Sequence, residues 1–234
     1  MNEKEELPEN MREDNLNEET KSLISSLPSH KDFLGKLYNY QGCWYYPNTL
    51  QGVLNFQKGF KPQETDIILA SFPKSGTTWL KALTIALFER FNNTSSSLQF
   101  DNPHGLVPFL EMSLYHKTSI PDLTKFSPSS PRLFSTHMPF HTLQAPFKDE
   151  SSPCKIVYVC RNVKDVLVSQ WYFRCASLSS MEINKTGKTS NNLHYSSFFR
   201  KGEVGDSKNH LTPEMETKID MIIEEKHKGS GFKY

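Results

Sequence analysis

The stretch from residue 65 to residue 90 constrains the fold more than any other part of the chain. Residues 65–72 (TDIILASF) are an almost continuous apolar run, typical of a β-strand buried on both faces of a parallel sheet. Pro73 ends this strand, and a loop containing Gly76 leads into a helix expected from residue 77 to about residue 90. The helix is indicated by apolar side chains at helical spacing, namely Leu80, Leu83, Leu87 and Phe88. A strand, a loop of small residues and an amphipathic helix in this order open an α/β fold.

The same kind of unit returns further along the chain. Residues 132–136 and 155–160 are predicted strands, the second rich in β-branched residues, and a helix is expected from about Val163. Residues 176–197 are rich in Ser, Asn, Lys and Thr and predict a loop. Residues 41–62 predict a short strand-and-turn segment that covers the core. These patterns together predict an α/β fold with a P-loop-like parallel sheet flanked by helices.

The two ends of the chain differ in character. Residues 1–20 hold eight acidic and two basic side chains and little to bury, so residues 1–30 are expected to be an acidic, disordered tail. The last predicted helix lies between Thr212, a suitable N-cap, and Gly229. Its apolar stripe consists of Met215, Ile219, Ile222 and Ile223. We find no internal repeat, and we expect residues 31–234 to form a single domain.

Composition narrows the class of protein. No stretch approaches the roughly 20 apolar residues of a membrane span, and the acidic start does not resemble a signal peptide. The four cysteines show no CxxC pairing, which argues against a zinc site and a disulfide framework. We therefore expect a cytoplasmic protein with neither a membrane nor a nucleic-acid partner. Beyond the acidic leader the chain is moderately basic, which suits an anionic ligand but would equally serve solubility.

The loop between the first strand and its helix, Phe72 to Trp79 (FPKSGTTW), is the most informative motif. Backbone N–H groups at a helix start attract phosphate, Gly76 allows close approach, and Thr77 and Thr78 add hydroxyl donors. Lys74 places a mobile positive charge beside such an anion. An ordinary strand-to-helix turn remains the alternative reading. The order of residues is not that of the Walker motif, which disfavours a metal-bound triphosphate and a P-loop kinase.

Three stretches in order resemble the soluble sulfotransferases, in a form close to the plant enzymes. Residues 73–83 (PKSGTTWLKAL) resemble the 5′-phosphosulfate loop of that family, and residues 158–169 (YVCRNVKDVLVS) its 3′-phosphate segment. Residues 199–206 (FRKGEVGD) resemble its C-terminal nucleotide loop. The resemblance implies the sulfotransferase fold and a donor, 3′-phosphoadenosine 5′-phosphosulfate (PAPS), that is used without a metal. It also implies that PAPS is contacted by Lys74, Ser75, Gly76, Thr77, Thr78 and Trp79.

The other two motifs supply further candidate anion ligands. Arg161 follows a predicted buried strand, where ligands of open α/β sheets gather, although an arginine there is as often a surface charge. Ser169 lies in the next helix, and Arg200 and Lys201 precede Gly202, which permits close backbone approach. The resemblance implies that all five residues bind the 3′-phosphate of the nucleotide.

His137 is the candidate catalytic base. It follows a predicted strand, and histidine can titrate near neutral pH, but any single histidine is more often structural. The resemblance assigns the role to His137, with a small hydroxylated acceptor, phenolic or steroid-like, and with Lys74 stabilising the leaving phosphate. A zinc site with His141 is rejected, because Pro139 lies between the two histidines and no third ligand follows at a useful spacing. A homodimer would use residues near Lys208 to Glu216, by the same resemblance.

The chain departs from the family in its length. Between the 3′-phosphate segment and the C-terminal loop only residues 175–198 remain, whereas the family has a long stretch with another strand and part of the acceptor pocket. We interpret this as an internal deletion that leaves the fold incomplete in its middle-to-C-terminal part. Ser207 also stands where the family usually has Trp. A catalytically impaired nucleotide-binding remnant is therefore the alternative to an active sulfotransferase.

Overall fold

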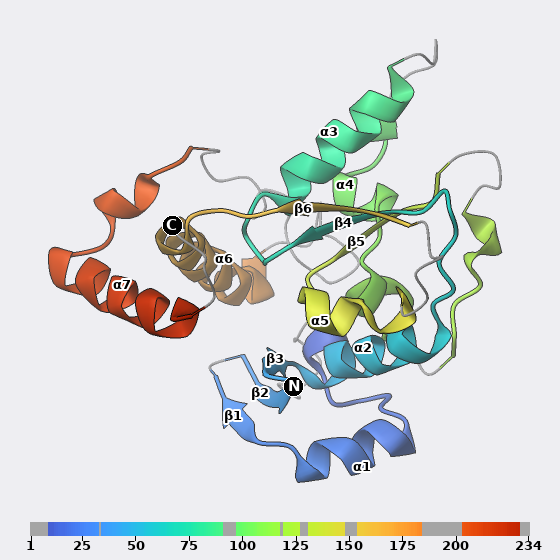
Figure 1. The fold of residues 1–234 in the computed structure, drawn as a ribbon, viewed down its shortest axis with the longest axis horizontal. Coiled ribbons are helices and arrows are strands. Elements are labelled where there is room, and N and C mark those ends of the chain that lie inside the picture. Colours follow the sequence, from blue (N-terminus) through green and yellow to red (C-terminus); the bar gives the residue numbers. More distant parts are fainter. Residues whose placement is uncertain are drawn as a thin grey trace.

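A three-stranded parallel sheet forms the centre of the molecule, as predicted (Figure 1). The computed structural model describes residues 9–32, 34–90, 97–117, 119–126, 131–147, 154–183 and 203–229. In the sheet β4 (Ile67–Ser71) lies between β5 (Leu133–Thr136) and β6 (Lys155–Val159). Ala70 of β4 is level with Thr136 of β5, and Ser71 is level with Val159 of β6. The carboxyl ends of all three strands therefore meet at one edge.

Residues 41–62 are mostly helical, which corrects the predicted strand-and-turn segment. Only β3 (Cys43–Tyr45) is a strand there, and it completes an antiparallel sheet with β1 (Ser29–Lys31) and β2 (Lys36–Tyr40). The helix α2 (Pro47–Gly59) follows, with Pro at its first position, where a missing N–H costs nothing. Gly52 lies inside this helix and allows the backbone of Glu111 to pack closely against it. A Cβ at Gly52 would lie 1.9 Å from the carbonyl oxygen of Glu111.

The acidic leader is folded from Glu9 onward, in contrast to the expected disordered tail. It forms η2 (Glu9–Met11) and α1 (Glu18–Ser26), and both contact α2. The Asn17 side chain caps α1 by accepting a hydrogen bond from the Thr20 N–H at 2.7 Å. The Asn17 N–H in turn donates to the buried Gln51 of α2 at 2.6 Å. Capping and this tether outweigh the poor apolar content of the segment.

The helix after β4 is confirmed, but the side of it predicted to be buried is wrong. α3 runs over Thr77–Glu89, and its buried side chains are Thr77, Thr78, Lys81 and Ile85. Leu83, Leu87 and Phe88 point to solvent, and Leu83 is 66% exposed. In Figure 1 α3 contacts the sheet at its N-terminal end and projects away from it further along. Apolar periodicity therefore located the helix without locating its packed face.

β6 and the helix after it also differ from expectation. β6 was predicted to be buried on both faces, but it is a sheet edge within the described residues, and Ile156, Val157 and Tyr158 are exposed. The helix α6 (Val163–Ile183) begins as predicted. It continues through residues 176–183, where a loop was expected.

The C-terminal helix α7 (Pro213–His227) has the predicted ends. Thr212 accepts a hydrogen bond from the Met215 N–H at 3.3 Å, and Gly229 beyond the helix has a φ of 82°. Its apolar stripe is not buried against the rest of the described chain.

The main core lies between α2 and the sheet and includes Leu50, Val53, Phe56, Ile68, Leu110, Tyr115 and Phe134. Short elements complete the chain: η3 (Ser97–Gln99), α4 (Pro103–Leu106), η4 (Leu110–Leu114), η5 (Leu123–Lys125), α5 (Phe140–Leu143), η6 (Ala145–Phe147) and η8 (Asp206–Asn209). A buried bidentate ion pair between Asp66 and Arg132 closes the amino ends of β4 and β5, with N–O distances of 2.6 and 2.7 Å. Among the described residues no helix is both long and apolar enough to cross a membrane.

Candidate functional site

Three predicted site motifs follow three neighbouring strands of the parallel sheet. The loop of Lys74 follows β4, His137 follows β5, and Arg161 follows β6. Since the carboxyl ends of these strands are level, the sheet brings the three motifs to one edge. This is the edge at which open α/β sheets bind their ligands.

The loop after β4 has the geometry of an anion site. Lys74 and Gly76 adopt left-handed backbone angles, with φ of 67° and 104°, so the chain turns sharply into α3. The Ser71 and Thr77 hydroxyl oxygens lie 2.6 Å apart and tie the end of β4 to the start of α3. The first N–H groups of α3 have no partners inside the helix, as at any helix start, and its dipole favours an anion there. The loop therefore fits a phosphate or sulfate group.

Two side chains of this loop reach beyond it. The Lys74 ammonium lies 4.1 Å from the ring centroid of Phe173 on α6, a cation–π contact that links the loop to the helix after β6. Trp79, on the first turn of α3, is 53% exposed. The adenine contact that the resemblance implies for Trp79 stays a prediction.

His137 has one ring nitrogen occupied and its protonation form fixed. Its Nδ1 lies 2.8 Å from the carbonyl oxygen of Ser71, which can only accept, so Nδ1 carries the proton. The lone pair of the neutral imidazole is then on Nε2. Burial, followed by the charges of Lys81 and Lys74, outweighs the Ser71 hydrogen bond and lowers the pKa of His137 to about 4. The His137 ring is therefore neutral throughout the physiological range.

A buried carboxylate, which the sequence analysis missed, holds the backbone at His137. Glu111 accepts hydrogen bonds from the His137 N–H at 2.8 Å and from the Thr136 hydroxyl at 2.9 Å. Burial raises the pKa of Glu111 despite these hydrogen bonds. The ring of Phe109, two residues earlier, packs against that of His137 at 4.6 Å between centroids. No local pattern marks these residues, because their partner is far away in the sequence.

Arg161 lies just past the end of the third strand, and Ser169 lies further along, inside α6. Arg161 donates a hydrogen bond to the carbonyl oxygen of Glu203 at 2.8 Å, and Ser169 is buried two turns into α6. Arg200, Lys201 and Gly202 lie outside the described residues. The next residue, Glu203, is described, and its carbonyl oxygen accepts this hydrogen bond from Arg161.

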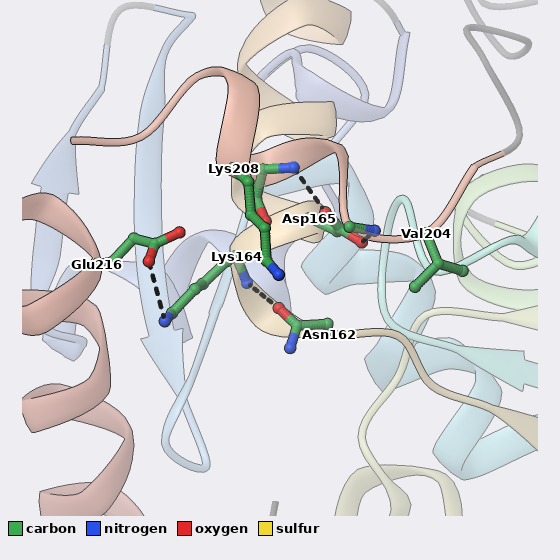
Figure 2. Close-up of a pocket in the computed structure, with 8 residues that line it drawn as sticks. Asn162, Lys164, Asp165, Val204, Lys208 and Glu216 are labelled. Atoms are coloured by element: carbon green, nitrogen blue, oxygen red, sulfur yellow. Dashed lines mark hydrogen bonds and ion pairs between the residues drawn. The ribbon is translucent and has the colours of Figure 1, made fainter. Parts of the chain in front are cut away.

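Asp165 anchors the turn after this predicted nucleotide loop. Its two carboxylate oxygens accept hydrogen bonds from the N–H groups of Gly205 at 2.7 Å and Ser207 at 2.9 Å. Asp165 also lines a pocket of about 180 Å³ together with Lys164, Lys208 and Glu216. Figure 2 shows Asp165 directed at this turn. The Lys164 ammonium is engaged by Asp220 at 2.8 Å. The pocket therefore lies at the contact between α6 and the C-terminal segment.

A second hydrogen-bonded group lies behind the loop, and sequence reasoning missed it too. Thr78 Oγ1 is 3.0 Å from His104 Nε2, and His104 Nδ1 is 3.0 Å from the Lys81 ammonium. Lys81 is fully buried, on the same face of α3 as Thr77 and Thr78. The sequence signal that could have indicated this group is a lysine, Lys81, at helical spacing from Thr77 and Thr78. The described residues contain no cluster of three metal-ligating side chains, and His141 Nε2 instead lies 2.9 Å from the carbonyl oxygen of Gln41.

The sequence matches a protein-family model described as "Sulfotransferase domain" over residues 64–182 and 176–231. Cytosolic sulfotransferase 1 of Arabidopsis thaliana is 47% identical over 330 aligned positions, which cover 99% of each chain. A crystal structure of an Arabidopsis thaliana sulphotransferase superposes with a TM-score of 0.70 and 32% identity, covering 97% of this chain and 99% of that one. Retinol dehydratase in complex with retinol and PAP (3′-phosphoadenosine 5′-phosphate) shares the fold, with a TM-score of 0.59 and 14% identity over 94% and 97% of the two chains.

The same comparisons locate a missing internal segment. The alignment with the Arabidopsis relative spans 330 positions and this chain has 234 residues, so at least 96 positions (330 less 234) are filled in the relative alone. The two matches to the family model meet at residues 176–182. The deletion inferred from the sequence therefore lies at the C-terminal end of α6.

Proposed function

The chain belongs to the sulfotransferase family, and on this premise we propose that it transfers a sulfuryl group from PAPS to a hydroxyl group of a small organic acceptor. The observation that carries the proposal is the geometry of His137. With Nδ1 bonded to Ser71 and a pKa lowered to about 4, this histidine keeps a free lone pair on Nε2. A general base needs that lone pair within reach of the acceptor proton.

The residues present suit each part of the donor. The loop from Lys74 to Thr78 offers a cation, hydroxyl groups and a helix N-terminus to the 5′-phosphosulfate. Arg161 and Ser169 offer a guanidinium and a hydroxyl group to the 3′-phosphate, with Arg200, Lys201 and Gly202 assigned to the same group by resemblance. Retinol dehydratase, which shares the fold, was crystallised with PAP, and this supports a nucleotide of the same kind here.

The proposed reaction is an in-line displacement at sulfur. His137 Nε2 removes the proton from the acceptor hydroxyl as its oxygen forms a bond to sulfur. The bond from sulfur to the oxygen of the 5′-phosphate breaks in the same step. Lys74 and the donors around Thr77 and Thr78 stabilise the negative charge that develops on that leaving oxygen. Positioning and electrostatics thus provide most of the catalysis, as in phosphoryl transfer.

The proposed acceptor class and location rest on the relatives. We propose a small hydroxylated acceptor, phenolic or steroid-like, since retinol dehydratase was solved with retinol, a small alcohol, and with the steroid alcohol androsterone. The relatives with high identity are named cytosolic sulfotransferases, which supports a cytoplasmic location. A nucleotide-binding remnant is the second candidate function, because at least 96 positions of the relatives are missing and β6 is left exposed.

Transfer of labelled sulfate from PAPS to a panel of phenols and steroids tests the proposal directly. Thermal stabilisation by PAP without Mg²⁺ measures donor binding separately. In the active enzyme His137→Ala lowers transfer by about 10²–10⁴-fold and leaves PAP binding nearly unchanged. PAP binding without any transfer would favour the remnant, and undiminished transfer by His137→Ala would remove His137 from its role.

A further inference from the structure

Lys81 is a buried cation with no part in the reaction described so far. Its Nζ lies 2.7 Å from the carbonyl oxygen of Val107 and 3.0 Å from His104 Nδ1. It also lies 3.5 Å from the ring centroid of Phe109, a contact that suits an ammonium group. Burial lowers the pKa of Lys81, and the charge of Glu111 opposes this. The Phe109 ring and the Glu111 charge favour the charged ammonium, which has three N–H groups and no lone pair, so it can only donate to Val107 and His104.

The contact with Lys81 selects one form of the His104 ring. With Nδ1 accepting from Lys81, the proton of the neutral imidazole must be on Nε2, which faces Thr78 Oγ1 at 3.0 Å. Burial, then the charges of Lys81, His137 and Lys74, lowers the pKa of His104 to about 2, so the ring remains neutral. Its plane stacks on Phe109 with an angle of 19° between the rings, which fixes its orientation.

These contacts make the hydrogen bonds among Lys81, His104 and Thr78 run in one direction. Lys81 donates to His104, and His104 Nε2–H donates to the Thr78 oxygen, so the proton of the Thr78 hydroxyl is free to point elsewhere. Thr78 stands on the first turn of α3, beside the anion loop. We propose that Lys81 and His104 are positioning residues that hold the Thr78 hydroxyl as a hydrogen-bond donor to the 5′-phosphosulfate of PAPS. This inference rests on the proposed function.

The hydrogen-bonded series Lys81–His104–Thr78, called the relay below, lies close to the proposed base His137 as well as to the donor loop. The Phe109 ring carries His104 on one side and contacts His137 on another, and Glu111, which holds the His137 backbone, interacts with Lys81. A change at His104 can therefore disturb the donor loop alone or the whole site. An experiment has to separate these two cases.

Ligand choice separates them, because PAP carries a 5′-phosphate and adenosine 3′-phosphate does not. In calorimetric titrations we expect Thr78→Val and His104→Phe each to weaken PAP binding by roughly tenfold or more. Binding of adenosine 3′-phosphate should be unchanged. Thr78→Ser restores the hydroxyl and should restore PAP affinity, and the double variant should bind PAP no worse than either single variant. Thr84→Val removes a hydroxyl that bonds only within α3 and is the matched control.

An equal loss for both ligands, or PAP affinities at the wild-type level in both variants, would overturn the relay. Should His104→Phe not fold, nitrogen NMR of His104 in the unmodified chain reads the ring form directly. The Nε2–H form supports the inference, and the Nδ1–H form overturns it. If the unmodified chain binds no PAP, the proposed function fails and this inference fails with it. If it binds PAP but His104 has the Nδ1–H form, only the inference fails.

Discussion

His137 illustrates how a single backbone contact sets the chemistry of a side chain. The Ser71 carbonyl holds the proton on Nδ1, and burial with nearby lysines lowers the pKa to about 4. A histidine at its ordinary pKa of about 6.5 would lose most of its neutral form by pH 5.5. Activity that depends on neutral His137 should therefore begin to fall at a lower pH than activity that depends on an exposed histidine.

The pH dependence of transfer should follow this lowered pKa. We expect kcat/KM to stay level between pH 7.5 and 5.5, where a pKa near 6.5 would lower it about tenfold. Stability should fall over the same range, because unfolding frees His104 and His137 to take up protons that the folded chain excludes. At pH 5.5 this costs about 1 kcal/mol for each histidine. Kinetics and melting curves at the two pH values check both statements, and a parallel loss of activity at constant stability would contradict them.

Gly52 shows a residue that acts on the site from a distance. An added Cβ would lie 1.9 Å from the carbonyl oxygen of Glu111, the residue whose side chain holds the His137 N–H. We expect Gly52→Ala to destabilise the fold by about 1–3 kcal/mol through overpacking and to lower transfer by displacing Glu111. Denaturant unfolding and the sulfate-transfer assay measure the two effects. Gly42→Ala is the control for removing a glycine, since nothing lies within 4 Å of its added Cβ, although its left-handed φ of 79° adds strain. Equal unfolding free energies of the Gly52 variant and the wild type would contradict the contact.

Residues that belong to a strand end could be placed from the sequence, and residues that act through long-range contacts could not. Lys74, His137 and Arg161 each follow an apolar run, so the parallel sheet brings them together. Glu111 and His104 have no such local mark, because their partners are 20 or more residues away. Ser169 and the Arg200–Gly202 assignments remain predictions.

For the strands and helices, local sequence patterns predicted where each element lies better than which of its faces is buried. The strands β4, β5 and β6 and the helices α3 and α7 lie where apolar runs and caps indicated. The faces they bury did not follow, since Leu83 of α3 and Tyr158 of β6 point to solvent. The apolar side chains of a family fold pack against neighbouring segments. A chain that lacks one segment lacks some of these packing partners. The same reasoning failed for α2, because residues 41–62 were interpreted as a strand and turns although residues 47–59 form a helix.

The contact between α6 and the C-terminal turn should control the nucleotide loop. Asp165 accepts two backbone N–H groups of that turn, and an amide in its place can accept at only one atom. We expect Asp165→Asn to weaken PAP binding roughly tenfold or more, with a smaller loss for adenosine 5′-phosphate, which lacks the 3′-phosphate. Asp220→Asn breaks the exposed pair with Lys164 and should change neither affinity. A uniform loss for both nucleotides would show that Asp165 acts on the fold rather than on the loop.

The whole molecule carries an apolar surface that a complete family member would be expected to cover. Exposed apolar side chains lie on α3, β6 and α6, and they include Leu83, Leu87, Ile156, Val157, Tyr158, Leu167 and Trp171. The strand β6 adds an edge that pairs with no further strand among the described residues. Such edges and patches invite association with other chains. We therefore expect the chain to be marginally stable and prone to self-association.

Restoring the missing segment tests this expectation. A family insert placed between Cys175 and Ser180 should cover part of this surface, and each large apolar side chain buried contributes about 1.5–3 kcal/mol. Melting temperature should rise by about 2–4 °C for each kcal/mol gained in a chain of this size. Scanning calorimetry, size-exclusion chromatography and the transfer assay compare the two chains. Equal solubility, melting temperature and turnover would show that the chain as it stands does not need the segment.

The level ends of the three parallel strands have a consequence for engineering. The proposed donor loop, the proposed base His137 and Arg161 all follow this small sheet, whereas the missing positions fall at one junction near residues 176–182. If these roles hold, the inserted segment can be varied while the three strand-end motifs are kept. The junction is thus a natural insertion point for a library of segments drawn from different relatives. Each graft would present a new acceptor pocket to an unchanged sulfuryl-donor site, and selection for sulfation of a chosen alcohol could then proceed without altering the chemistry.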